Sequence, residues 1–240
     1  MAASLHWPQD AELLNGIEDI DCGEFGRIQV GLHLVLASEK PLGRMSCVGE
    51  DGKLPGPDRL LAKILTRQID PDEFYAEIER QFAAFKVARG LEPDFVDAHQ
   101  HVHVYPILRK LVASATKRHA PNAWVRVPND RLSAILTRPF AGIAIGSAVH
   151  SLGFRSALAK TGLRSNVSFA GHYDFGDEYQ EYLPSFFNNV SLFHLIMCHP
   201  GTADLKEDPI ARARVSEAEI IGRMTLEERV ASLRAEGRHV

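Results

Sequence analysis

The feature that most constrains the fold is an alternation of short Val-, Leu- and Ile-rich runs with amphipathic stretches of helical period. Strands separated by helices are typical of an α/β fold with a mostly parallel sheet, because each helix covers the sheet and returns the chain to the same edge. Catalytic groups in such folds gather at the carboxyl ends of the strands. The runs that predict strands are 27–36, 93–100, 123–127, 165–170 and 191–201.

The clearest predicted helix covers residues 70–90. Asp70 is a suitable N-cap, Pro71 suits the first turn, and Glu73 completes a pattern like a capping box. Gly90 can end this helix. An apolar stripe at helical spacing predicts its buried face, made of Phe74, Ile78, Phe82 and Phe85. Further helices are predicted over 106–119, 216–224 and 225–237, and a buried helix or a lid over 141–154.

Composition excludes several classes of protein. The chain has 240 residues and a formal net charge of −4, so it carries no basic field for nucleic acid or an anionic membrane. Its 3 cysteines have no CxxC spacing, which is typical of free thiols in a reducing cytoplasm. No signal peptide is visible at the start, and no apolar run reaches the roughly 18 residues of a membrane helix. We therefore expect a cytoplasmic protein with a single domain over 1–240.

The segment DAHQHVHV, residues 97–104, places ionisable side chains at every second position. On a β-strand this period would put all of them on one face. Imidazoles gathered there repel one another when protonated and are costly to bury without partners. A divalent metal ion would satisfy them, because neutral imidazoles and carboxylates are common metal ligands. The side chains are those of Asp97, His99, His101 and His103.

Two more histidines accompany apolar runs that predict strands: His33 in VGLHLVL and His199 in MCHPG. Strand ends that are distant in sequence converge in a parallel sheet, so both could join the site on 97–104. Each of them taken alone is more often a hydrogen-bonded residue of the core or of a turn. Asp97 could bind the ion itself or accept a hydrogen bond from a ligating histidine. HxH motifs also serve two-metal phosphoesterases, which leaves that class of enzyme as an alternative.

The motifs GLHL, DFVDAHQHVHVYP and MCHPG, in this order, resemble those of the YdjC-like carbohydrate deacetylases. That family includes chitooligosaccharide deacetylases and hopanoid-biosynthesis-associated deacetylase-like proteins. The resemblance covers residues 1–235 approximately. It implies a distorted TIM-like (β/α) barrel that removes N-acetyl groups from amino sugars with one divalent metal ion, Mg²⁺ or Zn²⁺. The implied partner is a small carbohydrate substrate.

The resemblance also implies roles for individual residues. His33 and His99 are expected to bind the metal ion. His199 is expected in the active site, where we assign it as the general acid that protonates the leaving amine. Arg126, in WVRVPND, corresponds to an arginine on the substrate side of the site. The remaining two histidines of the run, His101 and His103, are expected to support the site or to face the substrate.

One departure from the family concerns the start of the chain. Family members begin with a strand ending in Asp-Asp-Phe-Gly, which supplies a metal ligand and the catalytic base, and this chain has no such motif. We therefore expect a barrel without the first strand and helix, and weak or absent activity unless Asp97 substitutes for the missing acids. The sheet edge left open is expected to be covered by the segment MAASLHWP or by a second copy in a homodimer. The alternative function is a non-catalytic protein of this fold that binds a sugar or a partner.

Overall fold

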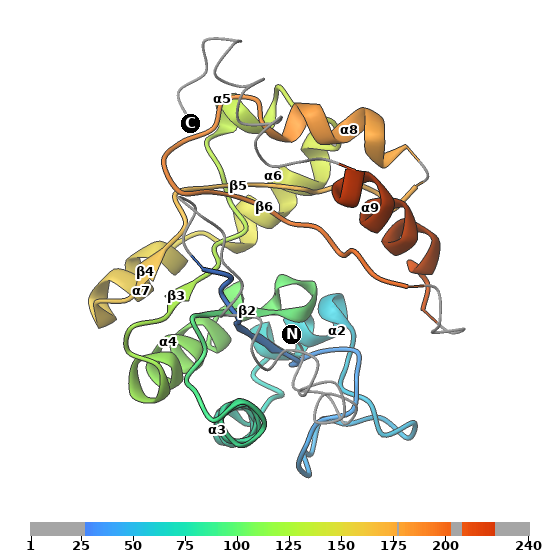
Figure 1. The fold of residues 1–240 in the computed structure, drawn as a ribbon. Helices are drawn as coiled ribbons and strands as arrows, with labels where there is room; N and C mark the ends of the chain where they lie inside the picture. Colours follow the sequence, from blue (N-terminus) through green and yellow to red (C-terminus); the bar gives the residue numbers. More distant parts are fainter. Residues whose placement is uncertain (1–26, 177, 203–207, 224–240) are drawn as a thin grey trace. The chain divides into compact units, whose positions relative to one another are not determined.

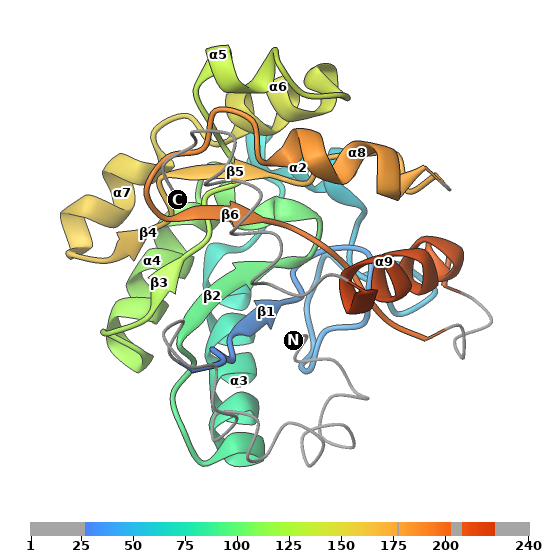
Figure 2. The same cartoon turned by 45° about the horizontal axis from the view of Figure 1, so that its top comes forward.

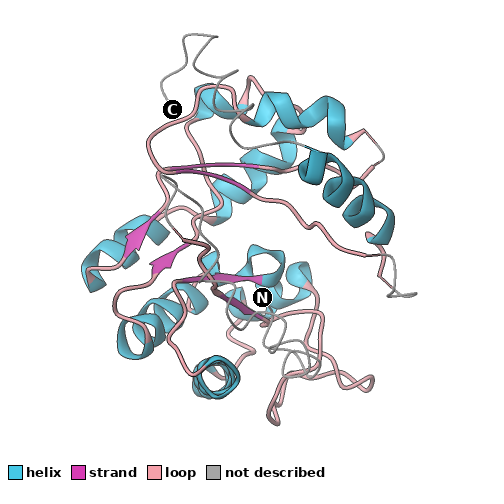
Figure 3. Cartoon of the chain, viewed as in Figure 1, coloured by secondary structure: helices cyan, strands magenta, loops and turns pink. Residues whose placement is uncertain are grey.

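The computed structural model describes residues 27–176, 178–202 and 208–223. The chain divides into two compact units. Unit 1 comprises Met1–Val127 and His150–Ser165, and unit 2 comprises Pro128–Val149 and Asn166–Val240. Figures 1 and 3 show the helices and strands of both units. Among the described residues, no helix has the length and apolarity needed to cross a membrane.

Unit 1 is built on a parallel sheet of four short strands in the order β1-β2-β3-β4, which Figure 2 shows side by side. Neighbours in the sheet are therefore also neighbours in strand number, and helices run between them, as in the wall of a (β/α) barrel. The α/β class with a parallel sheet is confirmed, while closure into a TIM-like barrel stays a prediction. The strands are β1 (Leu32–Leu34), β2 (Phe95–Ala98), β3 (Trp124–Val125) and β4 (Arg164–Ser165).

The long helix of unit 1, α3 (Pro71–Arg89), confirms the helix predicted over 70–90. The carboxylate of Asp70 accepts a hydrogen bond from the Asp72 backbone N–H at 2.9 Å, and Gly90 ends the helix in the left-handed conformation. The capping-box prediction is wrong, because the Glu73 carboxylate instead accepts hydrogen bonds from the backbone N–H and the hydroxyl of Ser46. The predicted apolar stripe is fully buried and comprises Phe74, Ile78, Phe82 and Phe85.

The other helices of unit 1 complete its core. The helix predicted over 106–119 is present and begins at Leu108. Side chains from α3, α4 and α7 pack with those of β1, β2 and β3 in one apolar cluster. Each large side chain buried in this way contributes roughly 1.5–3 kcal/mol to folding. The helices are α2 (Pro57–Leu65), α4 (Leu108–His119) and α7 (Phe154–Thr161).

Unit 2 contains a second parallel pair, β5 (Ser168–Ala170) and β6 (His194–Ile196). The run 165–170 thus contributes to strands of two different sheets. The strand predicted within 191–201 is present as β6, but the prediction that it is buried is wrong, because β6 has only three residues and each of them is half-buried. The helices of this unit are α5 (Leu132–Ile135), α6 (Ala141–His150, whose last residue belongs to unit 1), α8 (Tyr179–Phe186) and α9 (Ala211–Arg223).

Two helix predictions of the carboxyl-terminal half had different outcomes. The apolar segment 141–154 does form a helix, α6, but none of the residues of α6 is buried, so the prediction of a buried helix is wrong. The helix predicted over 216–224 corresponds to the second half of α9. The helix predicted over 225–237 lies outside the described residues, as does the segment MAASLHWP.

Close packing of β5 on β6 requires a glycine at position 171. Gly171 has φ +103°, and a Cβ atom there would lie 2.3 Å from the Met197 carbonyl oxygen and 2.8 Å from its nitrogen. We expect Gly171→Ala to lower the free energy of unfolding by about 2 kcal/mol or more, through left-handed strain and overpacking. The measurement is urea unfolding followed by circular dichroism.

The matched control is Gly146→Ala in helix α6 of the same unit. A Cβ atom at Gly146 would meet nothing within 4 Å. Alanine at this helical position is expected to stabilise the protein by about 0.5–1 kcal/mol. Equal unfolding midpoints for the two variants would contradict the packing argument.

Candidate functional site

The register of the unit 1 sheet brings three predicted site residues into one row. His33 on β1 is the register partner of Asp97 on β2, so both side chains lie on the same face. The Nδ1 atom of His33 lies 2.5 Å from the Oδ1 atom of Asp97. Arg126 directly follows β3, and its Nε atom lies 3.3 Å from the other carboxylate oxygen of Asp97. One carboxylate thus lies between an imidazole and a guanidinium group.

Burial and neighbouring charges act in opposite directions on the pKa values of Asp97 and His33. Burial by itself would raise the pKa of Asp97, but the charge of Arg126 and the contact with His33 outweigh it and hold that pKa well below its usual range. Burial lowers the pKa of His33, although Asp97 acts in the opposite direction. A neutral His33 that donates from Nδ1 to Asp97 has a lone pair on Nε2, and this is the form in which histidine binds a metal ion.

Arg126 serves as a brace between β2 and β3. Its Nη2 donates to the carbonyl of Ala98 at 2.8 Å, and its backbone N–H donates to the carbonyl of Val96 at 3.0 Å. The carbonyl of Arg126 accepts a hydrogen bond at 2.7 Å from Nε2 of His103. Only 6% of the arginine side chain is exposed. The structure therefore gives Arg126 a positioning role toward Asp97, and its contact with substrate stays a prediction.

The segment 97–104 is not one continuous strand, so the prediction that its four ionisable side chains share one face is wrong. Strand β2 ends at Ala98, and His99–Val104 form the 3₁₀ segment η4. Within it Gln100 (φ 52°, ψ 25°) and His101 (φ 58°, ψ 12°) adopt the left-handed conformation. This costs roughly 1–2 kcal/mol per non-glycine residue, and such strain is concentrated at functional sites. Side-chain contacts stabilise the turn, since Gln100 Oε1 accepts a hydrogen bond from the Ser38 hydroxyl at 2.7 Å.

The turn separates the three histidines of the run. The His99 ring stays beside the row, with its centroid 6.0 Å from that of His33. His101 is half-buried on the turn itself. His103 is fully buried, with its ring edge-on to Phe154, and burial together with the charge of Arg126 lowers its pKa to about 3. His103 thus contacts the Arg126 carbonyl within the core of unit 1, and its role in the site stays a prediction.

Two of the predicted metal ligands lie near each other among the described residues, and their binding of an ion stays a prediction. His33 and His99 are close enough for one ion to lie between them, and the Asp97 carboxylate orients the first of them. No group of three or more His, Cys, Asp or Glu side chains that could hold an ion occurs in the described part of the chain. Two imidazoles therefore fit a metal ion, and a third protein ligand is not among the residues described.

His199 belongs to unit 2, three residues after β6. Its backbone N–H donates a hydrogen bond to the carboxylate of Glu217 on α9, and its Nδ1 lies 3.8 Å from the other oxygen of that carboxylate. The ring lies edge-on to Phe175, with centroids 5.2 Å apart. Its convergence with His33 and His99, which lie in unit 1, stays a prediction.

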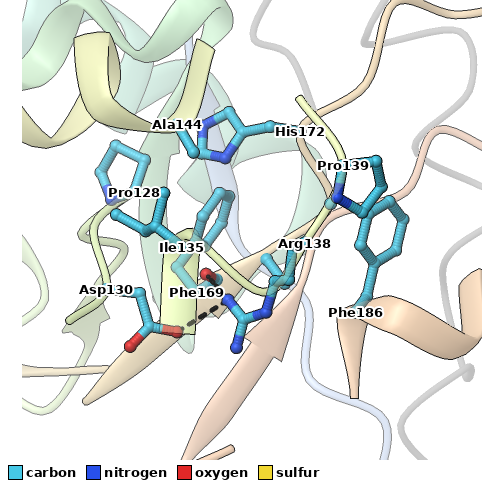
Figure 4. Close-up of a pocket in the computed structure, with 11 residues that line it drawn as sticks. Pro128, Asp130, Ile135, Arg138, Pro139, Ala144, Phe169, His172 and Phe186 are labelled. Carbon is cyan, nitrogen blue, oxygen red and sulfur yellow. Dashed lines mark hydrogen bonds and ion pairs between the residues drawn. The ribbon is translucent and has the colours of Figure 1, made fainter. Parts of the chain in front are cut away.

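Unit 2 also contains a small hollow of about 10 Å³ at the carboxyl end of β5 (Figure 4). Arg138 and Asp130 form a buried ion pair there, with 2.8 Å between Nη1 and Oδ2. The same guanidinium donates to the carbonyls of Phe169 and Asn188. Arg138 and Asp130 are thus paired within unit 2, where they hold together the segments that surround β5.

Sequence reasoning missed Glu217. The carboxylate of Glu217 is fully buried in unit 2 and also accepts a hydrogen bond from the Tyr173 hydroxyl. The available signal was the spacing within α9, where Glu217 lies four residues after the buried Ala213 and four before the apolar Ile221. An acid on the apolar face of a helix must have an internal partner, and this predicts a buried polar contact.

Comparison with known proteins agrees with the motifs. The profile of a family described as YdjC-like protein matches residues 1–232. A chitooligosaccharide deacetylase of Serratia marcescens is 38% identical over 90 residues, which are 37% of this chain and 35% of that protein. A carbohydrate deacetylase of Homo sapiens is 28% identical over 127 residues, 50% of this chain and 39% of that protein. A chitooligosaccharide deacetylase of Citrobacter koseri is 27% identical over 212 residues, 88% of this chain and 76% of that protein.

The charged row generates a prediction about stability and pH. Replacing Asp97 with Asn leaves Arg126 buried without its carboxylate, so we expect the free energy of unfolding at pH 7 to fall by on the order of 3 kcal/mol. Because the folded-state pKa of Asp97 is depressed, its contribution is present above the unfolded-state value and is lost as the pH falls below about 4. Urea unfolding of both proteins in a metal chelator, from pH 7 downward, measures the difference. A difference that stays constant or widens on acidification would contradict this account.

Proposed function

Because this chain belongs to the YdjC-like protein family, we propose that it is a metal-dependent hydrolase that removes N-acetyl groups from amino sugars. The relatives named above are chitooligosaccharide and carbohydrate deacetylases, which supports a carbohydrate substrate. The observation that carries the proposal is the pair formed by His33 and Asp97, with the ring of His99 beside it. A carboxylate-oriented histidine next to a second imidazole is an arrangement typical of metal centres.

His33 and His99 would hold the ion, with Asp97 fixing the orientation of the first ring. A bound divalent ion would polarise the amide carbonyl and lower the pKa of the attacking water. Arg126 keeps Asp97 charged and in place, so that Nε2 of His33 stays directed away from the carboxylate. Asp97 is also the acid that we expect to act in place of the Asp-Asp pair of the family. Its low pKa favours the orienting role over that of a strong base.

His199 would supply the proton that the leaving amine requires, because an amine is a poor leaving group until it is protonated. Its side chain is 27% exposed, while its backbone is tied to α9 through Glu217. The ring is thus partly exposed while its backbone is held in place. The expected homodimer and the expected cytoplasmic location are part of the same proposal.

A second candidate is a non-catalytic protein that binds the sugar. It is favoured by one observation, that the described residues contain no group of three potential metal ligands. The two functions differ in a direct assay. Binding of chitooligosaccharides without release of acetate, at any divalent ion tested, would favour the binding protein.

The deacetylase prediction concerns turnover. The chain is incubated with N-acetylated chitooligosaccharides and Mg²⁺ or Zn²⁺, and released acetate is quantified. We expect weak or absent release from this chain unless Asp97 substitutes for the missing acids, and in an active version of the protein we expect His199→Ala to lower turnover by roughly a hundredfold or more, the contribution typical of a general acid. Metal affinity should be unchanged in this variant. Loss of the metal from His199→Ala would instead identify His199 as a ligand.

The metal prediction concerns affinity. Titration calorimetry with Zn²⁺ should show that His33→Ala and His99→Ala each weaken binding, by at least about tenfold, because each removes an imidazole ligand. His150→Ala is the matched control, since His150 is an exposed imidazole of unit 1. Wild-type affinity in either of the first two variants would remove that histidine from the metal site.

A further inference from the structure

The loop that carries His199 is anchored by a buried carboxylate of another element. Glu217 on α9 is fully buried, and its Oε2 accepts a hydrogen bond from the backbone N–H of His199. Its Oε1 accepts a hydrogen bond from the hydroxyl of Tyr173 and lies 3.8 Å from Nδ1 of the His199 ring. Both oxygens thus face donors, as expected for an acceptor-only carboxylate. One side chain holds the His199 backbone and faces its ring.

His199 is the basic residue that faces the Glu217 carboxylate, because the nearby arginine is paired with another acid. Arg214, on the same helix, is committed to Asp208, with Nε 2.5 Å from Oδ2, and its Nη1 donates to the His199 carbonyl at 3.3 Å. No lysine or arginine is paired with Glu217 in the part of the chain that the structure describes. A buried carboxylate is costly unless it is hydrogen-bonded and paired, so a proton on Nδ1 of His199 is favoured.

Packing restricts the orientation of the His199 ring. Nδ1 is buried and makes no hydrogen bond with the described residues, with a Glu217 oxygen 3.8 Å away, whereas the side chain as a whole is 27% exposed, so the exposed part of the ring lies away from Nδ1. Phe175 packs edge-on against the ring at a centroid distance of 5.2 Å, which restricts its rotation. Nε2 is therefore the nitrogen left to meet a substrate.

We propose that Glu217 is the positioning residue for His199: it keeps a proton on Nδ1 and so directs Nε2 to the substrate. This rests on the proposed function, in which His199 is the general acid. In that step the imidazolium transfers the Nε2 proton to the leaving amine nitrogen as the C–N bond breaks. The neutral ring that remains keeps its Nδ1 proton beside Glu217. A carboxylate behind a catalytic histidine holds the tautomer and orientation in this manner.

The test is long-range ¹H–¹⁵N spectroscopy of the full chain, without metal or substrate, at a pH where the rings are neutral. The His199 signals are identified by their loss in His199→Gln. We expect the Nδ1–H tautomer in the wild-type protein. Glu217→Gln should shift His199 to the Nε2–H tautomer, because the single amide oxygen accepts from the backbone N–H and leaves the amide NH₂ facing Nδ1. The Gln side chain has nearly the shape of Glu, and circular dichroism checks that the fold is kept.

Tyr173→Phe is the matched control. It removes the other donor to the same carboxylate oxygen but not the ring partner of His199, so the Nδ1–H tautomer should persist. An Nε2–H tautomer in the wild-type protein, or one tautomer shared by wild type and Glu217→Gln, would overturn the proposal. A purely structural role for Glu217 predicts the latter result.

Kinetics separate this proposal from the deacetylase function. On an N-acetylated chitooligosaccharide, Glu217→Gln should lower kcat by at least about tenfold with KM little changed. On an aryl acetate ester, whose leaving group departs without a proton, the loss should be several times smaller. Equal losses on both substrates would overturn the positioning role. An Nδ1–H tautomer together with no acetate release by the wild-type protein would overturn the deacetylase function and leave the Glu217 contact standing.

Discussion

The carboxylate of Asp97, held between the His33 imidazole and the Arg126 guanidinium, is the interaction on which the candidate site depends. Parallel register makes it possible, because His33 and Asp97 are partners across β1 and β2. A largely buried carboxylate such as that of Asp97 must be paired. Each of its two partners also has a second role. Arg126 joins the ends of β2 and β3, and His33 keeps one ring nitrogen available. Folding and preorganisation of the site thus depend on the same contacts.

Unit 2 contains a looser pair of the same kind, with 3.8 Å between the ring nitrogen and the acid. There the buried carboxylate is that of Glu217, and the histidine that it faces is His199. In both units the acid comes from a different element than the histidine, so each ring is oriented by tertiary packing and not by its own segment. Deacetylation needs an ion at one point and a proton at another, and each unit supplies an imidazole held for one of these tasks under the proposed function.

Local sequence predicted helices and strands well where the determining features lie close together in the chain. Helix α3 follows from its N-cap at Asp70, its apolar stripe and Gly90, and all three features act within a few residues of each other. The alternation of strands and helices likewise predicted a parallel sheet. The same reasoning failed for α6, whose apolar residues are not buried within the described structure, since hydrophobicity alone does not specify which neighbour covers a helix.

The sequence by itself predicted which residues would form the candidate site: His33, Asp97 and His99 were all identified from their motifs, and the structure brings them together. It did not determine how the run 97–104 is folded, because a period of two has meaning only while the backbone stays extended. The left-handed turn at Gln100 ends that period, and the cost of such a turn is met by packing against segments distant in the chain. Only the tertiary structure separated the histidines and set a buried glutamate behind His199, because both outcomes depend on contacts between elements that are far apart in sequence.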